Sequence, residues 1–261
     1  MLDCESDEEG RTFLARQSFR APMHLSKPYW EGNYLIINAV NPTAGLFPGD
    51  SIDLDLRVRK DASVVFTSPS ASRIYRGRVG VVRVHQHFQV EEGGWLDVFP
   101  ELLIPHKGSH YVQNTVIHLK SRSGLFFTEM LAPGRLAFGE AFDFEKIEMR
   151  TELRIAEELV ALDNYRLMPT DGSIRALRIL YENSYYAACF LFSEHLPSLV
   201  DFQQLALSHP QATAAISYFP QGVAVIRIIA GDSIALKRII FAIRAFVYRE
   251  IGNRLPILRK Q

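Results

Sequence analysis

The chain has 261 residues, and 48% of them are hydrophobic, which is enough to bury a sizeable core. Its 29 basic and 29 acidic residues cancel, so no overall field attracts nucleic acid or an anionic membrane. The first residues lack the basic and apolar regions of a signal peptide, and no later segment offers about 18 consecutive apolar residues. We therefore expect a protein that binds neither nucleic acid nor a membrane.

The two cysteines and the N-terminal residues indicate a compartment and a domain boundary. Cys4 lies in an acidic stretch and Cys189 in the apolar run YYAACFLF, a usage that favours a reducing compartment and predicts a cytoplasmic protein. The first ten residues, MLDCESDEEG, are predicted to form an acidic, disordered tail. Residues 11–261 are predicted to form a single β domain.

Most of the chain alternates polar and apolar residues with the period of a β-strand. In SIDLDLRVR, from Ser51 to Arg59, the aliphatic side chains share one face and the charged ones share the other. Similar runs follow at VVFTS, VGVVRVHQHFQV, WLDVF, YVQNTVIHLKS, LFFTEML, FDFEKIEMRTELRI and IRALRILYE. So many strands predict a mainly β fold, either a sandwich or a coiled sheet. The pattern shows no fixed repeat length, so it does not by itself predict a regular solenoid.

Helical signals occur only near the C-terminus. Ser198 and Asp201 have the spacing of a capping box, which predicts a short helix over 199–207. After the apolar runs AAISYF and GVAVIRII, Asp232 or the following serine is predicted to cap a longer helix that ends at Gly252. Apolar residues recur along this second helix at helical spacing, which indicates one buried face.

The second predicted helix also carries basic residues, which we assign to its other face. They are Lys237, Arg238, Arg244 and Arg249. The pattern leaves two interpretations open: this basic face is a solvated surface, or it docks an acidic partner.

The usual signatures of nucleotide, zinc and hydrolase sites are missing from the sequence. It contains no GxGxxG after a strand, no phosphate loop, no HExxH, no CxxC and no GxSxG. One metal-like spacing remains, His85-Gln-His87, which on a strand places both imidazoles on the same face. Nickel or zinc accepts such ligands, but two ligands make at most half a site. The alternative is a pair of surface histidines.

Several acidic residues lie where turns meet strands, namely Asp50, Glu101, Glu129 and Glu140. A carboxylate flanked by aromatic residues is costly to bury unless it pairs with a cation or accepts hydrogen bonds. In LAPGRLAFGEAF, Glu140 follows Arg135 closely. An ion pair that pins the turn and a carboxylate open to water or a metal ion are both consistent with this pattern, and the same holds for Glu129.

Five stretches in a fixed order resemble a known family. They are NPTAGLFPGDSIDLDLRV, FTSPSASRIYRG, LDVFPELLIPHKGS, LFFTEMLAPGRLAFGEAF and GVAVIRIIAGDSIALKRIIFAIRAFVYREIGNRLPILR. Their order and spacing resemble urease accessory protein D, also called UreD or UreH, from about Ala15 to the C-terminus. The resemblance implies a many-stranded β-helical fold with two helices near the C-terminus. It also implies a non-enzymatic chaperone that helps to install the nickel centre of urease.

The resemblance further implies partners and a route for the metal. Such a protein is expected to lie between apo-urease and accessory protein F, to which the GTPase accessory protein G attaches. We predict that the second helix helps to dock accessory protein F through Arg238, Arg244 and Arg249. Nickel is expected to cross it through a water-filled passage. The matching motifs assign Asp50 and Glu140 to this passage, Ser70 and Arg135 are expected to support it, and Glu129 is a further candidate ligand. Spaced, weak oxygen ligands suit an ion in transit, so no tightly bound cofactor is expected.

Two rival functions come from other classes. Sandwich and β-helical folds also host carbohydrate-active enzymes that use two carboxylates as acid and base, a role open to Glu129 with Glu140 or Asp50. Sugar sites usually expose tryptophans, however, and this chain has only Trp30 and Trp95. The other rival is a β-rich interaction module with no metal role.

Overall fold

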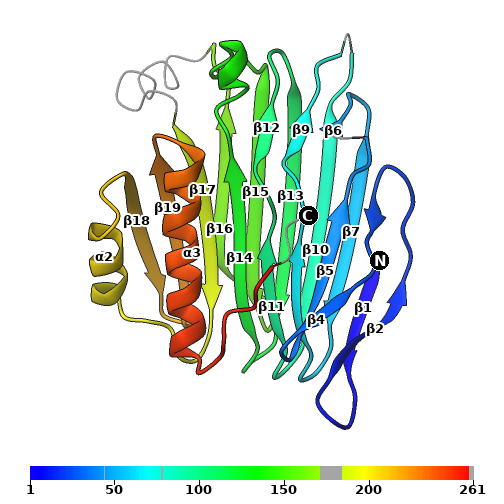
Figure 1. Cartoon of the computed structure of the whole chain (residues 1–261), viewed down its shortest axis with the longest axis vertical. Helices are drawn as coiled ribbons and strands as arrows, with labels where there is room; N and C mark the ends of the chain where they lie inside the picture. The colour runs from blue at the N-terminus through cyan, green and yellow to red at the C-terminus, as the bar shows by residue number, and fades with distance from the viewer. Residues whose placement is uncertain (44, 78, 171–183, 259–261) are drawn as a thin grey trace.

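In the computed structural model, two β-sheets form the body of the molecule and two α-helices lie outside one of them (Figure 1). The structure describes residues 1–43, 45–77, 79–170 and 184–258. Within these residues the fold is mainly β with helices α2 (Leu199–Leu207) and α3 (Ser233–Glu250), as predicted. The predicted strand IRALRILYE falls at 174–182, outside the described residues.

The first sheet consists mostly of parallel strands. In spatial order it contains β16 (Glu158–Leu167), β15 (Lys146–Ile155), β13 (His110–Leu119), β10 (Val82–Val90), β7 (Ser51–Val58), β1 (Leu2–Ser6) and β2 (Thr12–Gln17). Its outermost pairs, β16 with β15 and β2 with β1, are antiparallel, and the pairs between them are parallel. Along β13 every second residue is buried, which confirms the predicted alternation.

The second sheet runs beside the first and carries the helices. In spatial order it contains β18 (Ala212–Phe219), β19 (Val223–Ala230), β17 (Tyr185–Phe192), β14 (Gly124–Leu131), β11 (Trp95–Phe99), β8 (Ser63–Thr67), β5 (Tyr34–Val40) and β3 (His24–Leu25). Short strands attach to it at β4 (Tyr29–Glu31), β6 (Gly45–Leu46), β9 (Ser72–Ile74) and β12 (Leu103–Pro105). All of β14 is buried, because one face meets the first sheet and the other lies under α3.

The central strands alternate between the two sheets along the chain, so each pair forms one turn of a solenoid-like coil. Equivalent positions stay in line across four strands of the first sheet, as in the row Leu54, Gln86, Thr115 and Thr151. These four positions are unequally spaced in the sequence because the connecting loops differ in length. The uneven spacing explains why the sequence shows no fixed repeat.

Three apolar clusters fill the layers. One lies between the sheets around Phe88, Ile117 and Phe127, and another lies between them around Val84 and Tyr111. The third cluster packs α3 against the outer face of the second sheet. The core is therefore divided, and polar residues lie between the first two clusters.

The N-terminal residues differ from the predicted disordered tail. Leu2–Ser6 form β1, which pairs with β2 on one side and in parallel with β7 on the other. Leu2 and Cys4 are buried, and the carboxylate of Asp3 accepts two hydrogen bonds from Arg59 at 2.7 and 2.9 Å. The tail prediction was wrong because it counted acidic residues, whereas the apolar residues alternate with them at strand period.

Helix α3 begins where its cap was predicted and packs as its apolar stripe requires. The carboxylate of Asp232 accepts hydrogen bonds from the N–H groups of Ile234 and Ala235, both at 2.8 Å. Its apolar stripe is buried against the second sheet, which Figure 1 shows behind it. The capping box of α2, between Ser198 and Asp201, is also present.

One of the basic residues assigned to the outer face of α3 lies on the inner face. Arg244 is 0% exposed, and its guanidinium lies 2.5 Å from the carboxylate of Asp97, which is also 0% exposed. The hydroxyl of Tyr248 donates to the same carboxylate at 2.7 Å. Arg244 follows Ile240 by four residues, so helical geometry places it on the buried stripe whatever its charge. The docking prediction for Arg244 is therefore wrong, while Arg238 and Arg249 are exposed.

Candidate functional site

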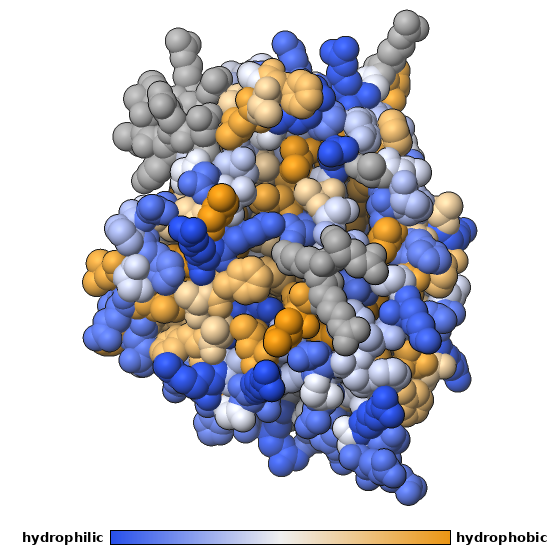
Figure 2. Space-filling model, viewed as in Figure 1, coloured by the Kyte–Doolittle hydropathy of each residue, from blue (hydrophilic) through white to orange (hydrophobic). Residues whose placement is uncertain are grey.

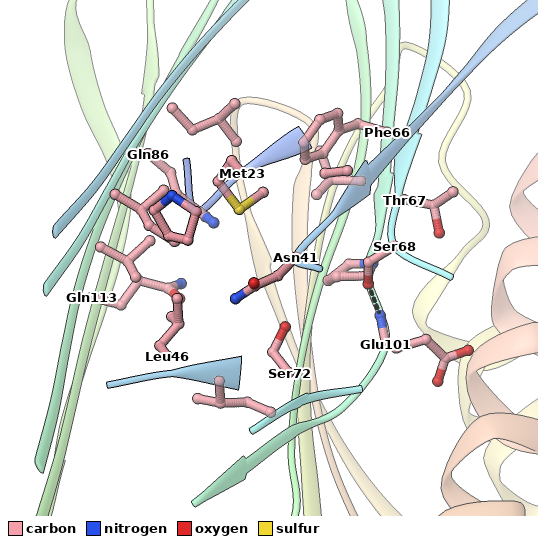
Figure 3. Close-up of a pocket in the computed structure, with 18 of the residues that line it drawn as sticks. Met23, Asn41, Leu46, Phe66, Thr67, Ser68, Ser72, Gln86, Glu101 and Gln113 are labelled. Atoms are coloured by element: carbon pink, nitrogen blue, oxygen red, sulfur yellow. Dashed lines mark hydrogen bonds between the residues drawn. The ribbon is translucent and has the colours of Figure 1, made fainter. Parts of the chain in front are cut away.

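A cavity of about 460 Å³ lies between the two sheets. Figure 3 shows Gln86 and Gln113 of the first sheet on one side of it and Thr67, Ser68 and Glu101 on the other. Residues with polar side chains thus line this space on both sides. A cavity of this size that is lined by polar groups can hold water or a hydrated ion, whereas an apolar cavity stays dry.

A polar row crosses the inner face of the first sheet. Gln86, Thr115 and Thr151 occupy aligned positions on β10, β13 and β15, where other rows of the same face carry Phe88 and Ile117. The hydroxyl of Thr115 donates to the Gln86 amide oxygen at 3.1 Å. Gln113 Nε2 donates to Thr115 Oγ1 at 3.2 Å, so hydrogen-bonded side chains replace apolar packing at this level.

Glu129 of β14 meets this polar row from the opposite sheet. Its Oε1 accepts hydrogen bonds from Gln113 Nε2 at 2.6 Å and from Thr151 Oγ1 at 3.1 Å. Gln113 is oriented in turn by the hydroxyl of Tyr111, which donates to its amide oxygen at 2.5 Å. Glu129 is only 5% exposed and lines the cavity. Its position joins the two sheets through one carboxylate.

Glu129 is held without a neutralising cation among the described residues. Burial raises the pKa of its carboxyl to about 8, and the negative charge of Asp163 acts in the same direction. Asp163 has its own cation, because Arg227 Nη2 lies 3.0 Å from its carboxylate. Glu129 therefore carries a proton through much of the neutral range, and a metal ion that binds it must displace that proton.

The rim of the cavity on the α3 side is formed by Glu101 and Ser68. The N–H of Glu101 donates to Ser68 Oγ at 2.9 Å, as the dashed line in Figure 3 shows. The carboxylate of Glu101 points towards the helix, where Lys237 Nζ lies 2.5 Å from its Oε2. This ion pair connects the cavity rim with α3.

Two further predicted residues lie near the cavity, but only one lines it. Ser70 contributes to the lining. Asp50 lies next to the lining residue Ser51, and its carboxylate accepts a hydrogen bond from the N–H of Phe47 at 2.8 Å. Asp50 thus braces the turn before β7, and its part in metal transfer stays a prediction.

Arg135 and Glu140 form a local ion pair. Arg135 donates from Nε and Nη2 to the two carboxylate oxygens at 2.8 and 2.5 Å, and the N–H of Lys107 donates to Glu140 at 3.1 Å. The hydrogen bonds from Arg135 lower the pKa of Glu140 to about 2. Gly134, with φ of 148°, leaves room for the Glu140 carbonyl oxygen, which a Cβ would meet at 2.6 Å. The geometry favours the turn-pinning interpretation of Glu140, which is not among the residues lining the cavity.

Comparison with the sequences of known proteins places the chain in a family. A sequence profile described as UreD urease accessory protein matches residues 1–260. The chain belongs to the UreD family. A urease accessory protein UreD from Opitutus terrae is 38% identical over 245 residues, which cover 90% of this chain and 88% of that protein. One from Staphylococcus aureus strain bovine RF122 / ET3-1 is 28% identical over 227 residues, covering 85% and 82%.

In this UreD-family protein His87 of the HQH motif contacts residues of the two neighbouring strands. His85 and His87 both lie on the outer face of β10, as predicted, but the ring of His87 contacts His118 of β13 with centroids 5.2 Å apart. His87 Nδ1 also lies 3.5 Å from the carboxylate of Asp55. Within the described residues, no three His, Cys, Asp or Glu side chains gather in a way that would hold a metal ion. No helix in that part of the chain has the length and apolar character to cross a membrane.

Sequence reasoning missed the polar row of this UreD-family cavity. In YVQNTVIHL, Gln113 and Thr115 share strand parity with Tyr111 and Ile117, so they were readable as inward-facing polar residues. Thr151 has the same inward parity within β15. The alternation within each strand indicated which side chains point inward. The alignment of β10, β13 and β15 could not be predicted from the sequence, because it depends on loop lengths.

Proposed function

We propose that this chain delivers nickel to apo-urease and is not itself an enzyme. It would act within a complex that contains accessory protein F and, through F, the GTPase accessory protein G. The observation that supports the proposal best is the cavity between the sheets, with Glu129 opposite the polar row of Gln86, Thr115 and Thr151. Membership in a urease accessory family supplies the biological setting.

The cavity chemistry suits an ion that must bind and then leave. Carboxylate, amide and hydroxyl oxygens are weak ligands for a borderline divalent ion, whereas a closed set of thiolates or imidazoles would retain it. Among the described residues, only neutral donors form hydrogen bonds to Glu129, so nickel would find a carboxyl whose proton it can displace. Because binding then requires loss of a proton, the affinity of this position stays moderate near neutral pH.

The face around α2 and α3 is the candidate surface for docking accessory protein F. Figure 2 shows apolar and charged side chains intermixed on this face. The exposed apolar residues of the two helices are Leu199, Val200, Leu207, Ile234 and Phe241. Arg238 and Arg249 remain the candidate basic contacts, because Arg244 is buried. Interfaces commonly combine exposed apolar side chains with arginine.

Glu129→Gln tests the proposed function. Glutamine keeps the size and can still accept from Gln113 and Thr151, so we expect normal folding and complex yield. The nickel content of urease matured with the variant should fall at least about tenfold, because the exchangeable oxygen ligand is lost. The experiment co-expresses the variant with the matching urease operon and measures complex yield and nickel per urease.

Glu158→Gln is the matched control, because Glu158 is an exposed carboxylate on β16. It should leave both measurements unchanged. Full nickel loading by Glu129→Gln in a normally assembled complex would reject the cavity as the route. A loss of complex in parallel with nickel would instead show that Glu129 serves assembly.

A further inference from the structure

Glu101 lies at the boundary between the cavity and the helix layer. It belongs to the cavity lining, yet its carboxylate points towards α3 (Figure 3). Its side chain is 9% exposed, while that of Lys237, whose ammonium it binds at 2.5 Å, is 29% exposed. One partner of this ion pair therefore faces the interior and the other reaches the solvent.

Several hydrogen bonds to its backbone hold the loop that carries Glu101. The Glu101 N–H is bound by Ser68 Oγ, and Thr67 Oγ1 donates to the Phe99 carbonyl at 2.5 Å. The carbonyl of Leu102 accepts from the Ser72 N–H at 2.9 Å. These hydrogen bonds to the backbone of residues 99–102 tie the ends of β8 and β11 together.

Lys237 combines a fixed backbone with a movable charge. It lies in the second turn of α3 between Leu236, which is buried, and Arg238, which is exposed. The packed helix holds its Cα in place, while four single bonds allow the ammonium to leave Glu101 for water. The ammonium is a compact cation that lies directly beside this carboxylate.

We propose that Glu101 is a further nickel-accepting carboxylate at the α3-side rim of the cavity, and that the Lys237 ammonium competes with nickel for it. This inference rests on the proposed nickel-transfer function. A divalent ion attracts the carboxylate more strongly than a single ammonium does, so nickel can replace Lys237. The tethered ammonium returns when nickel leaves. Lys237 thereby keeps the affinity of Glu101 for nickel low enough for the ion to be released.

The proposal predicts opposite effects for the two partners of one ion pair. Lys237→Gln removes the competitor and should tighten Ni²⁺ binding about fivefold, which corresponds to the free energy of a partly exposed ion pair. Glu101→Gln removes the ligand and should weaken binding or lower its stoichiometry. In the double variant the Lys237 substitution should have no further effect on binding. A purely structural salt bridge would instead make both single variants behave alike.

The measurement is calorimetric titration with Ni²⁺ alone on the full chain co-purified with accessory protein F, with the melting temperature recorded for each variant. Arg166→Gln is the control, because Arg166 pairs with Glu148 in the first sheet, and neither residue lines the cavity or belongs to α3. Wild-type nickel binding by both Glu101→Gln and Lys237→Gln would overturn the proposal, and so would weakened binding by both. If Glu129→Gln alone lowers urease nickel content, the proposed function survives and this inference fails. If none of the three variants changes nickel binding or loading, both fail.

Discussion

Two buried carboxylates of the described residues, Asp97 and Glu129, are held in two different ways. Asp97, under α3, is 0% exposed and meets the guanidinium of Arg244 at 2.5 Å. Glu129, in the cavity, is 5% exposed, and within the described part of the chain its carboxylate accepts only from the neutral donors Gln113 and Thr151. Under α3 the charge of Asp97 is paired with a cation, whereas in the cavity the carboxyl of Glu129 can exchange its proton. The first arrangement holds α3 against the second sheet, and the second holds a carboxyl in the cavity through neutral hydrogen bonds.

Breaking the buried ion pair between Arg244 and Asp97 should have the largest effect on stability. Arg244→Met leaves Asp97 buried without its cation and should lower the free energy of unfolding by about 3–5 kcal/mol. Arg238→Met, on the exposed face of α3, should change it by less than about 0.5 kcal/mol. Urea denaturation measures both. Adding Asp97→Asn to Arg244→Met should recover part of the loss, and the absence of any recovery would contradict the charge-burial explanation.

The pH dependence of stability sharpens the comparison at Glu129. Its carboxyl titrates near the ordinary value of 4.5 when unfolded and near 8 when folded, so between these values the native state holds one proton more. The free energy of unfolding should therefore fall as pH rises from about 4.5 to 8 relative to Glu129→Gln, which lacks this proton. Melting temperatures of both proteins at pH 5 and pH 8 test this. Parallel pH profiles would mean that the carboxyl is already ionised.

The smallest effect is expected at the exposed ion pair of the turn. The pKa of Glu140 is lowered from 4.5 to about 2, so its stabilisation is present above 4.5 and is lost as pH falls towards 2. Glu140→Gln should lower the melting temperature at pH 7 by less than Arg244→Met does, because solvent screens this pair. The difference from wild type should shrink on acidification. Reduced urease nickel with an unchanged melting temperature would instead restore a transfer role for Glu140.

Local signals in the sequence were sufficient for most elements. The alternation in SIDLDLRVR became β7, and the capping residues Ser198 and Asp232 begin α2 and α3. The run FDFEKIEMRTELRI was predicted as one strand, but β15 begins only at Lys146, because the preceding residues form the turn beside Arg135 and Glu140. Such elements depend on neighbours within a few residues, so pattern and capping chemistry can predict them.

Residue type alone was a poor guide to burial. Arg244 was assigned to the outer face for its charge, although its helical position places it inside. The acidic N-terminal residues suggested disorder, although Leu2 and Cys4 anchor β1 in the first sheet. In both cases a specific partner distant in sequence, Asp97 for Arg244 and Arg59 for Asp3, compensates the buried charge. Partners of this kind are invisible to a local pattern.

The sequence by itself determined the strands, the two C-terminal helices and the family resemblance, because each depends on short-range order along the chain. Only the tertiary structure decided that Glu129 faces the polar row while Glu140 closes a turn. The two residues lie in one continuous stretch, yet their surroundings come from β13 and β15 in one case and from Arg135 in the other. The coil register that brings Gln113 and Thr151 to Glu129 depends on the lengths of loops, and no residue pattern within a strand encodes it.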